Sequence, residues 1–163
     1  MTSSGRFEIG PLPAVLEDQR ARAAGSQDAS WDRLFYGHFC LKIDGRDFGR
    51  TEHALRVTYE LLEAINTIVF QGKENASVSF FESVHSIGLC VQARTDMLVV
   101  SQADHPDRVF DQPEEESAPV PLRAFAAAIY KCHVGLCDQA VRMYPGRFTH
   151  ANRATIPYSD HLI

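Results

Sequence analysis

The sequence predicts an α+β domain: a mostly antiparallel four-stranded sheet with two long helices packed on one face, plus a short N-terminal helix. Two long stretches have helical hydrophobic periodicity, and several short stretches alternate apolar and polar residues. These strands do not alternate strictly with helices, which argues against a parallel sheet. With 163 residues, the chain is long enough for one such domain.

We expect residues 1–30 to form an N-terminal arm and not a second domain. Pro13 suits a first helical turn, and Gly25 is typical of the position just past a helix end, so we expect a short exposed helix over 13–24. A small, polar linker follows. The single α+β domain is then expected over 31–146. Residues 147–163 have no clear periodicity and predict a C-terminal tail.

Two longer helices are predicted. The first follows Thr51, which can cap it, and extends to about Phe70 with a broad apolar face. Glu52 and Arg56 fall on its polar face, where Glu52 favours the positive N-terminal end. The second helix extends from about Pro121 to Tyr144.

Strands are predicted over 38–43, 77–83, 86–93 and 97–102. In the first, Phe39, Leu41 and Ile43 alternate with polar or small residues, and Asp44-Gly45 then forms a turn. The other three follow one another with short connections, which predicts an antiparallel meander.

The four cysteines match no disulfide framework and predict reduced, mostly buried thiols. Cys132, His133 and Cys137 invite a zinc interpretation, but cysteines five apart on a helix point in different directions. We therefore predict no metal and no cofactor. His133 is expected in the core, hydrogen-bonded to a carbonyl or hydroxyl group.

Catalysis is the weaker alternative for this chain. Glu82 could form an acid–base pair with His85 or His38, but no nucleophile lies in a recognisable loop or elbow. The turn around Asp44 lacks the lysine and the glycine spacing of a nucleotide site. No catalytic residue is therefore predicted.

A segment between the last predicted strand and the last helix carries the net charge. Residues 103–119 hold six carboxylates and a single arginine, whereas the whole chain has a formal net charge of -5. Acidic, Pro-containing connectors are often solvated linkers, which is the plain interpretation. This one is unusually long, however, and has Val109 and Phe110 among its charges. We therefore expect it to dock against a cationic protein surface, with the carboxylates raising the association rate and Phe110 supplying contact area. The predicted partner-binding residues are Asp104, Asp107, Phe110, Asp111, Glu114, Glu115 and Glu116.

Composition narrows the class of partner. A sequence pI near 5.8 with scattered basic residues argues against nucleic acid. The N-terminal residues lack the apolar core of a secretory signal, and no apolar stretch is long enough to span a membrane. We therefore expect a cytoplasmic protein, and the sequence leaves a homodimer open.

The strand ending at Asp44-Gly45, the amphipathic helix, the antiparallel sheet and the closing helix together give a layout over residues 31–144. This layout resembles the small α+β immunity proteins that bacteria make against their own polymorphic or contact-delivered toxins. The resemblance implies a non-catalytic inhibitor that occupies a cognate, basic toxin domain in bacterial competition. The alternatives are a small enzyme using Glu82 and a histidine in a pocket beside the sheet, or an adaptor or structural subunit of a larger complex.

Overall fold

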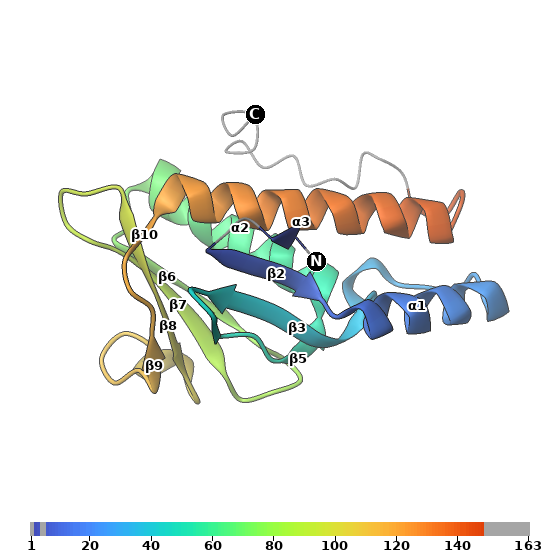
Figure 1. Cartoon of the computed structure of the whole chain (residues 1–163), viewed down its shortest axis with the longest axis horizontal. Coiled ribbons are helices and arrows are strands. Elements are labelled where there is room, and N and C mark those ends of the chain that lie inside the picture. The colour runs from blue at the N-terminus through green and yellow to red at the C-terminus, as the bar shows by residue number, and fades with distance from the viewer. Residues whose placement is uncertain (1, 4–5, 149–163) are drawn as a thin grey trace.

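The computed structural model describes residues 2–3 and 6–148. Three α-helices and a series of antiparallel strands make up an α+β fold (Figure 1). The helices are α1 (Pro13–Gly25), α2 (Ala54–Gln71) and α3 (Leu122–Met143). The α+β class and the antiparallel pairing predicted from the sequence are therefore confirmed. Among the described residues, no helix combines the length and apolar character needed to cross a membrane.

The strands form two sheets, where the sequence predicted one. In the first sheet, β1 (Thr2–Ser3), β2 (Phe7–Pro11), β3 (Tyr36–Ile43) and β4 (Arg46–Asp47) are neighbours in that order, and β5 (Thr51–His53) also pairs with β3. In the second sheet the order is β10 (Val120–Pro121), β8 (Met97–Ala103), β7 (Ser86–Val91) and β6 (Asn75–Ser79). Strand β9 (Glu115–Glu116) also pairs with β8.

Part of the expected N-terminal arm contributes a strand to the first sheet. Phe7 pairs with Ile43 and Ile9 pairs with Leu41, and both Phe7 and Ile9 are buried. These two apolar residues are separated by Glu8, which is the alternation of a half-buried strand. Residues 7–11 are therefore part of the fold. The predicted boundary between arm and domain at residue 30 would divide the first sheet, because β2 lies before it and β3 after it.

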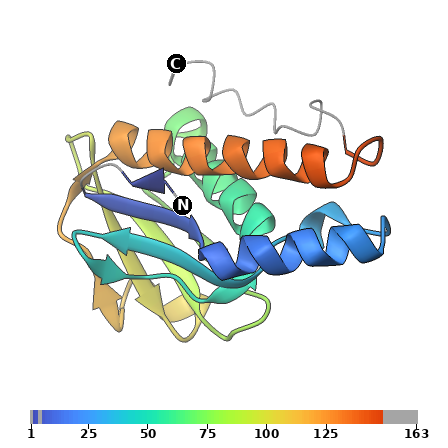
Figure 2. The ribbon, with the colours of Figure 1, turned by 45° about the vertical axis from the view of Figure 1, so that its right-hand side comes forward.

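The two long helices pack against each other and cover the sheets. Helix α3 contacts β2, and α2 contacts β6 and β3 as well as α3. In Figure 2, α3 lies above β2 and β3, and α2 crosses behind it. One hydrophobic core joins both sheets to both helices, and it includes Leu62 and Ile129, as the helical periodicity predicted.

The start of α2 differs from the prediction. Thr51 does not cap the helix, because Thr51–His53 form β5 and His53 is the residue before the helix. Glu52 and Arg56 were expected on a polar face but are both buried. Glu52 is therefore a buried residue of β5, just before the start of α2.

Candidate functional site

The acidic segment between β8 and β10 is an ordered part of the second sheet. It contains the short helix η2 (Pro106–Arg108) and strand β9. The backbone N–H groups of Glu114 and Ser117 donate to the carbonyl oxygens of Gln102 and Val100, each at 2.8 Å. Arg46 Nη1 donates to the carbonyl oxygen of Glu116 at 2.7 Å. The segment therefore has the backbone bonding of an extra strand along β8, not that of a free linker.

The apolar residues of this segment fix it to the sheet. Val109 is fully buried, and its carbonyl oxygen accepts a hydrogen bond from Ser101 Oγ at 2.7 Å. Phe110 is half-buried. A Cβ added to Gly88 would lie only 2.8 Å from Phe110 Cε1, so this glycine makes room for the ring. Val109 therefore cannot contact a partner, and part of the Phe110 ring faces its own sheet.

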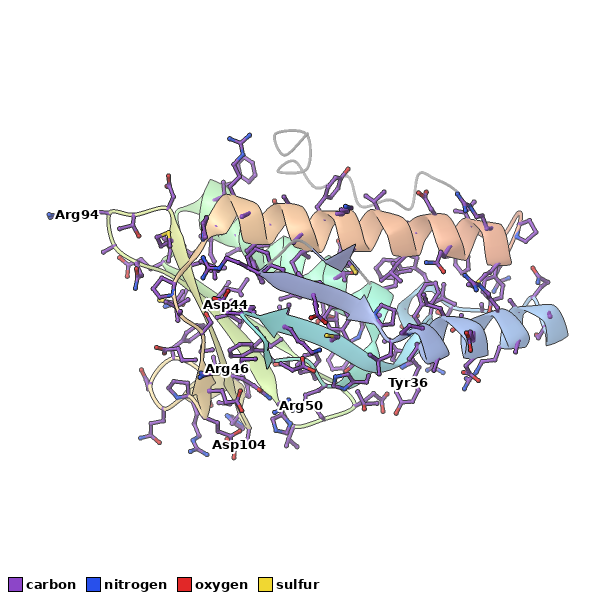
Figure 3. All side chains as sticks on the ribbon, in the orientation of Figure 1. Tyr36, Asp44, Arg46, Arg50, Arg94 and Asp104 are labelled. Carbon is purple, nitrogen blue, oxygen red and sulfur yellow. The ribbon has the colours of Figure 1, made fainter. Side chains whose placement is uncertain are left out.

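The carboxylates of the segment face solvent. Asp104 forms an ion pair with Arg108 at 2.8 Å, and Asp107 lies 3.5 Å from His105 Nδ1. Four other carboxylates are exposed and form no ion pair within residues 6–148: Asp111, Glu114, Glu115 and Glu116. The structure thus brings together the acidic residues predicted for partner binding, on a fixed backbone. Arg46 and Arg50 lie at the same end of the molecule as Asp104 (Figure 3), and they place positive charge at the border of this surface.

The turn between β6 and β7, residues 80–85, presents two apolar side chains beside the acidic segment. Phe81 is 74% exposed and Val84 is 76% exposed. The register pairs Ser79 with Ser86 and Ser86 with Ala103, so this turn lies next to the residue where the acidic segment begins. Helix η2 contacts both β6 and β7. We refer to residues 80–85 as the apolar turn.

Glu52 holds the apolar turn in place. Its buried carboxylate accepts backbone N–H bonds from Phe81 at 2.6 Å and from Glu82 at 3.0 Å, besides one from His53 at 2.9 Å. Burial alone would raise the pKa of Glu52, but these N–H groups and the Arg56 guanidinium outweigh it, so the pKa lies below its ordinary value. The exposed turn is thus anchored by a buried charge.

Arg56 completes the anchor. Its guanidinium lies 2.7 Å from carboxylate oxygens of both Glu52 and Glu60. Its Cζ atom also lies 3.7 Å from the centre of the Phe81 ring, a cation–π contact. The Phe81 ring therefore has a defined position although most of its surface is exposed, and a side chain held in position loses less entropy on binding.

The alternative of an acid–base pair meets a different geometry from the predicted one. The sequence analysis paired Glu82 with His85 or His38, whereas in the structure Glu82 lies 3.7 Å from His53. His38 contacts Asp47 at 2.8 Å. Four surface cavities of the described residues are lined by neither Glu82 nor His53. None of these four cavities therefore places Glu82 beside a histidine, as the enzyme hypothesis would need.

Glu52, His53 and Glu82 could bring three ligand atoms within 4.8 Å of one another. However, the Glu52 oxygens already accept three backbone N–H bonds, and Arg56 lies beside them. A metal ion would have to displace these donors and approach a fixed positive charge. The donor set therefore fits an anchor for the turn better than a metal centre.

His133 is a core histidine, as predicted. It is buried, and its Nδ1 lies 2.9 Å from the Thr58 hydroxyl while Nε2 lies 3.5 Å from Cys137 Sγ. Burial lowers the pKa of His133 to about 4 and raises that of the Cys132 thiol to about 12. All four cysteines are free thiols.

A scan against protein families, a search of curated proteins and a search of solved structures each found no match to this chain. We therefore infer a function for this chain from its geometry. The sequence analysis proposed the acidic residues for partner binding and did not include Phe81 or Val84, which the structure places in the apolar turn. The adjacent pair Phe80-Phe81 was an available signal, because two neighbouring residues of the strand predicted over 77–83 would face opposite sides, which leaves one of the two rings outside the core.

Proposed function

We propose that this protein is a non-catalytic, protein-binding inhibitor that meets a basic partner with the acidic segment and the apolar turn. The observation that carries the proposal is the ordered acidic segment, whose backbone is bonded to β8 while its carboxylates face solvent. Fixed charges of one sign steer a complementary partner and suppress wrong ones. A fixed loop also loses less entropy on binding than a flexible linker would.

The apolar turn supplies what the acidic segment lacks. Phe110 and Val109 are directed partly or wholly toward their own sheet, whereas Phe81 and Val84 are exposed next to it. Exposed aromatic side chains surrounded by charges are typical of the centre of a protein interface. The proposed surface therefore combines carboxylates that raise the association rate with apolar contacts that slow dissociation.

Within this class, an immunity protein against a bacterial toxin is our specific proposal. It depends on the resemblance of layout and on the acidic surface, which suits the basic substrate-binding cleft that such toxins often have. The free cysteines support a reducing compartment, which agrees with a cytoplasmic location.

The proposal predicts that a toxin-like protein is encoded directly upstream of this gene, and co-expression with that protein tests it. Cells that carry the wild-type protein are expected to grow, and the two purified proteins are expected to co-elute. A variant with four exposed carboxylates neutralised should lose both effects: Asp107→Asn, Asp111→Asn, Glu114→Gln and Glu115→Gln. Equal protection by this variant, or no binding between the wild-type proteins, would contradict the proposal.

A matched control removes the same number of exposed charges elsewhere. It carries Glu17→Gln, Asp18→Asn, Glu74→Gln and Asp96→Asn, all at exposed positions outside the acidic segment. This variant has the same net charge as the first one. Retained binding by the control would therefore show that position, rather than net charge, determines recognition.

A further inference from the structure

Strand β6 has an open edge. Among residues 6–148 it is the terminal strand of the second sheet, where only β7 pairs with it. The bonds from Phe80 N to His85 O and from Val91 N to Glu74 O show which residues face β7. Because these directions alternate along an antiparallel strand, the N–H and C=O groups of Asn75, Ser77 and Ser79 point away from the sheet. The three side chains are exposed as well.

In the part of the chain that the structure describes, this edge has no lysine, proline or β-bulge, three of the features that prevent pairing with another chain. Exposed edge strands are commonly protected by lysine, proline or a β-bulge. The sequence of β6 is Asn-Ala-Ser-Val-Ser, and its register with β7 is continuous. The backbone of the edge is therefore available to another strand.

A groove of about 490 Å³ lies along this edge, between β6 and α2. Its lining includes Glu60, Glu63 and Thr67 from the helix, Ser77 and Ser79 from the strand, and Phe81 from the apolar turn. A helix beside an open strand edge is the arrangement in which several protein modules hold an extended peptide as an added strand. The main chain of such a peptide gives affinity, and its alternate side chains enter the groove.

The charge of the groove identifies the kind of peptide. Glu63 is exposed and forms no ion pair with the residues that the structure describes. Glu60 is bonded to Arg56, and burial raises its pKa above the ordinary value. No lysine or arginine is among the lining residues. The free charge is thus the carboxylate of Glu63, which favours a lysine or arginine side chain from the peptide, and Phe81 favours an apolar one.

We propose that an extended segment of a partner protein, containing lysine or arginine, binds as an added strand along β6 in this groove. The inference rests on the proposed function, because it supplies a binding mode for the same kind of basic partner. It places part of that partner across Phe81, so that the groove and the apolar turn form one continuous interface.

The test uses a synthetic ten-residue peptide that alternates lysine with valine or threonine, and the same peptide with glutamate in place of lysine. Binding of the lysine peptide is expected to shift the amide NMR signals of Ser77 and Ser79 and to slow their hydrogen exchange. Ser77→Pro removes an N–H that β7 does not use, so the variant should fold but bind at least tenfold more weakly. Glu63→Lys should weaken binding to a similar extent, and Glu17→Lys on α1 is the matched control.

Several results would overturn the inference. These are the absence of any shift at Ser77 and Ser79, wild-type affinity in the Ser77→Pro or the Glu63→Lys variant, or binding of the glutamate peptide as tight as that of the lysine peptide. Sedimentation showing that two copies of the chain pair through β6 would also overturn it. One result separates the two proposals. If the variant with neutralised carboxylates no longer binds the toxin-like partner but Ser77→Pro still does, the proposed function stands and the strand-addition mode is rejected.

Discussion

At the scale of single residues, the buried ion pair of Glu52 and Arg56 has two roles. It satisfies the backbone of the apolar turn, and it places a cation under Phe81. Removing one partner of a buried ion pair costs roughly 3–5 kcal/mol, because the other charge is left uncompensated. The pair is therefore a structural requirement for the exposed residues that we assign to binding.

We expect Glu52→Gln to lower the free energy of unfolding at pH 7 by roughly 3–5 kcal/mol. The folded-state pKa of Glu52 lies below its ordinary value of 4.5, so its stabilisation is present above that pH and is lost as the pH falls through the folded pKa. The difference between the variant and the wild type should thus shrink below about pH 4.5. Urea denaturation at several pH values measures it. Glu63→Gln, an exposed position on the same helix, should change stability by less than about 0.5 kcal/mol.

Burial of His133 should give the free energy of unfolding a second dependence on pH. Its pKa is lowered from 6.5 to about 4 by burial, so the unfolded chain binds a proton in this range while the folded chain does not. The stability that neutral His133 provides is fully present above pH 6.5 and is lost progressively as the pH falls toward 4, by about 3 kcal/mol. His133→Gln keeps a hydrogen-bonding group for Thr58 without titrating. Identical pH dependence of the variant and the wild type would contradict this assignment.

At the scale of elements, the apolar turn and the acidic segment depend on contacts that single variants can break. Gly88 on β7 lies beneath the acidic segment, within reach of Ser101, Val109 and Phe110. We expect Gly88→Ala to displace Val109 and Phe110 and to cost about 1–3 kcal/mol, as in overpacked cores. Faster hydrogen exchange at the amides of Glu114 and Ser117 would report the loss of the bonds to β8. Unchanged exchange would show that the segment does not depend on this contact.

The apolar turn makes a separate prediction. Phe81→Ser combined with Val84→Ser should change stability by less than about 1.5 kcal/mol, because both side chains are exposed and only the cation–π contact with Arg56 is lost. Affinity for the partner should fall at least tenfold, as expected for apolar anchors at an interface centre. Val69→Ser, at the opposite end of α2, is the control and should leave affinity unchanged. Calorimetry or surface plasmon resonance distinguishes these outcomes.

The same elements show what could be predicted from the sequence. Periodicity predicted α2, α3 and the meander of β6, β7 and β8, because long apolar patterns report burial directly. It could not predict that Glu52 is buried, because a carboxylate becomes buried only when a distant segment, here the backbone of Phe81, supplies its donors. The division into two sheets was missed for a similar reason. It depends on the pairing of β2 with β3, in which Pro11 pairs with Phe39 across 27 intervening residues.

At the scale of the whole molecule, charge and apolar surface gather at one end of the second sheet. The acidic segment begins beside the apolar turn, where η2 contacts β6 and β7, and it continues along β8. One hydrophobic core joins both sheets to α2 and α3 and holds these two segments in place. A rigid scaffold that presents charged and apolar groups on loops is a common arrangement for binding proteins. We therefore assign recognition to this end of the molecule and stability to the remainder.

The association rate with the toxin-like partner, measured by stopped flow at several salt concentrations, tests this assignment most directly. The variant with Asp107, Asp111, Glu114 and Glu115 neutralised is predicted to associate at least tenfold more slowly at low salt and to show a weaker salt dependence, while the control with four neutralised carboxylates elsewhere behaves as the wild type does. Equal association rates and equal salt dependence for all three proteins would contradict the account.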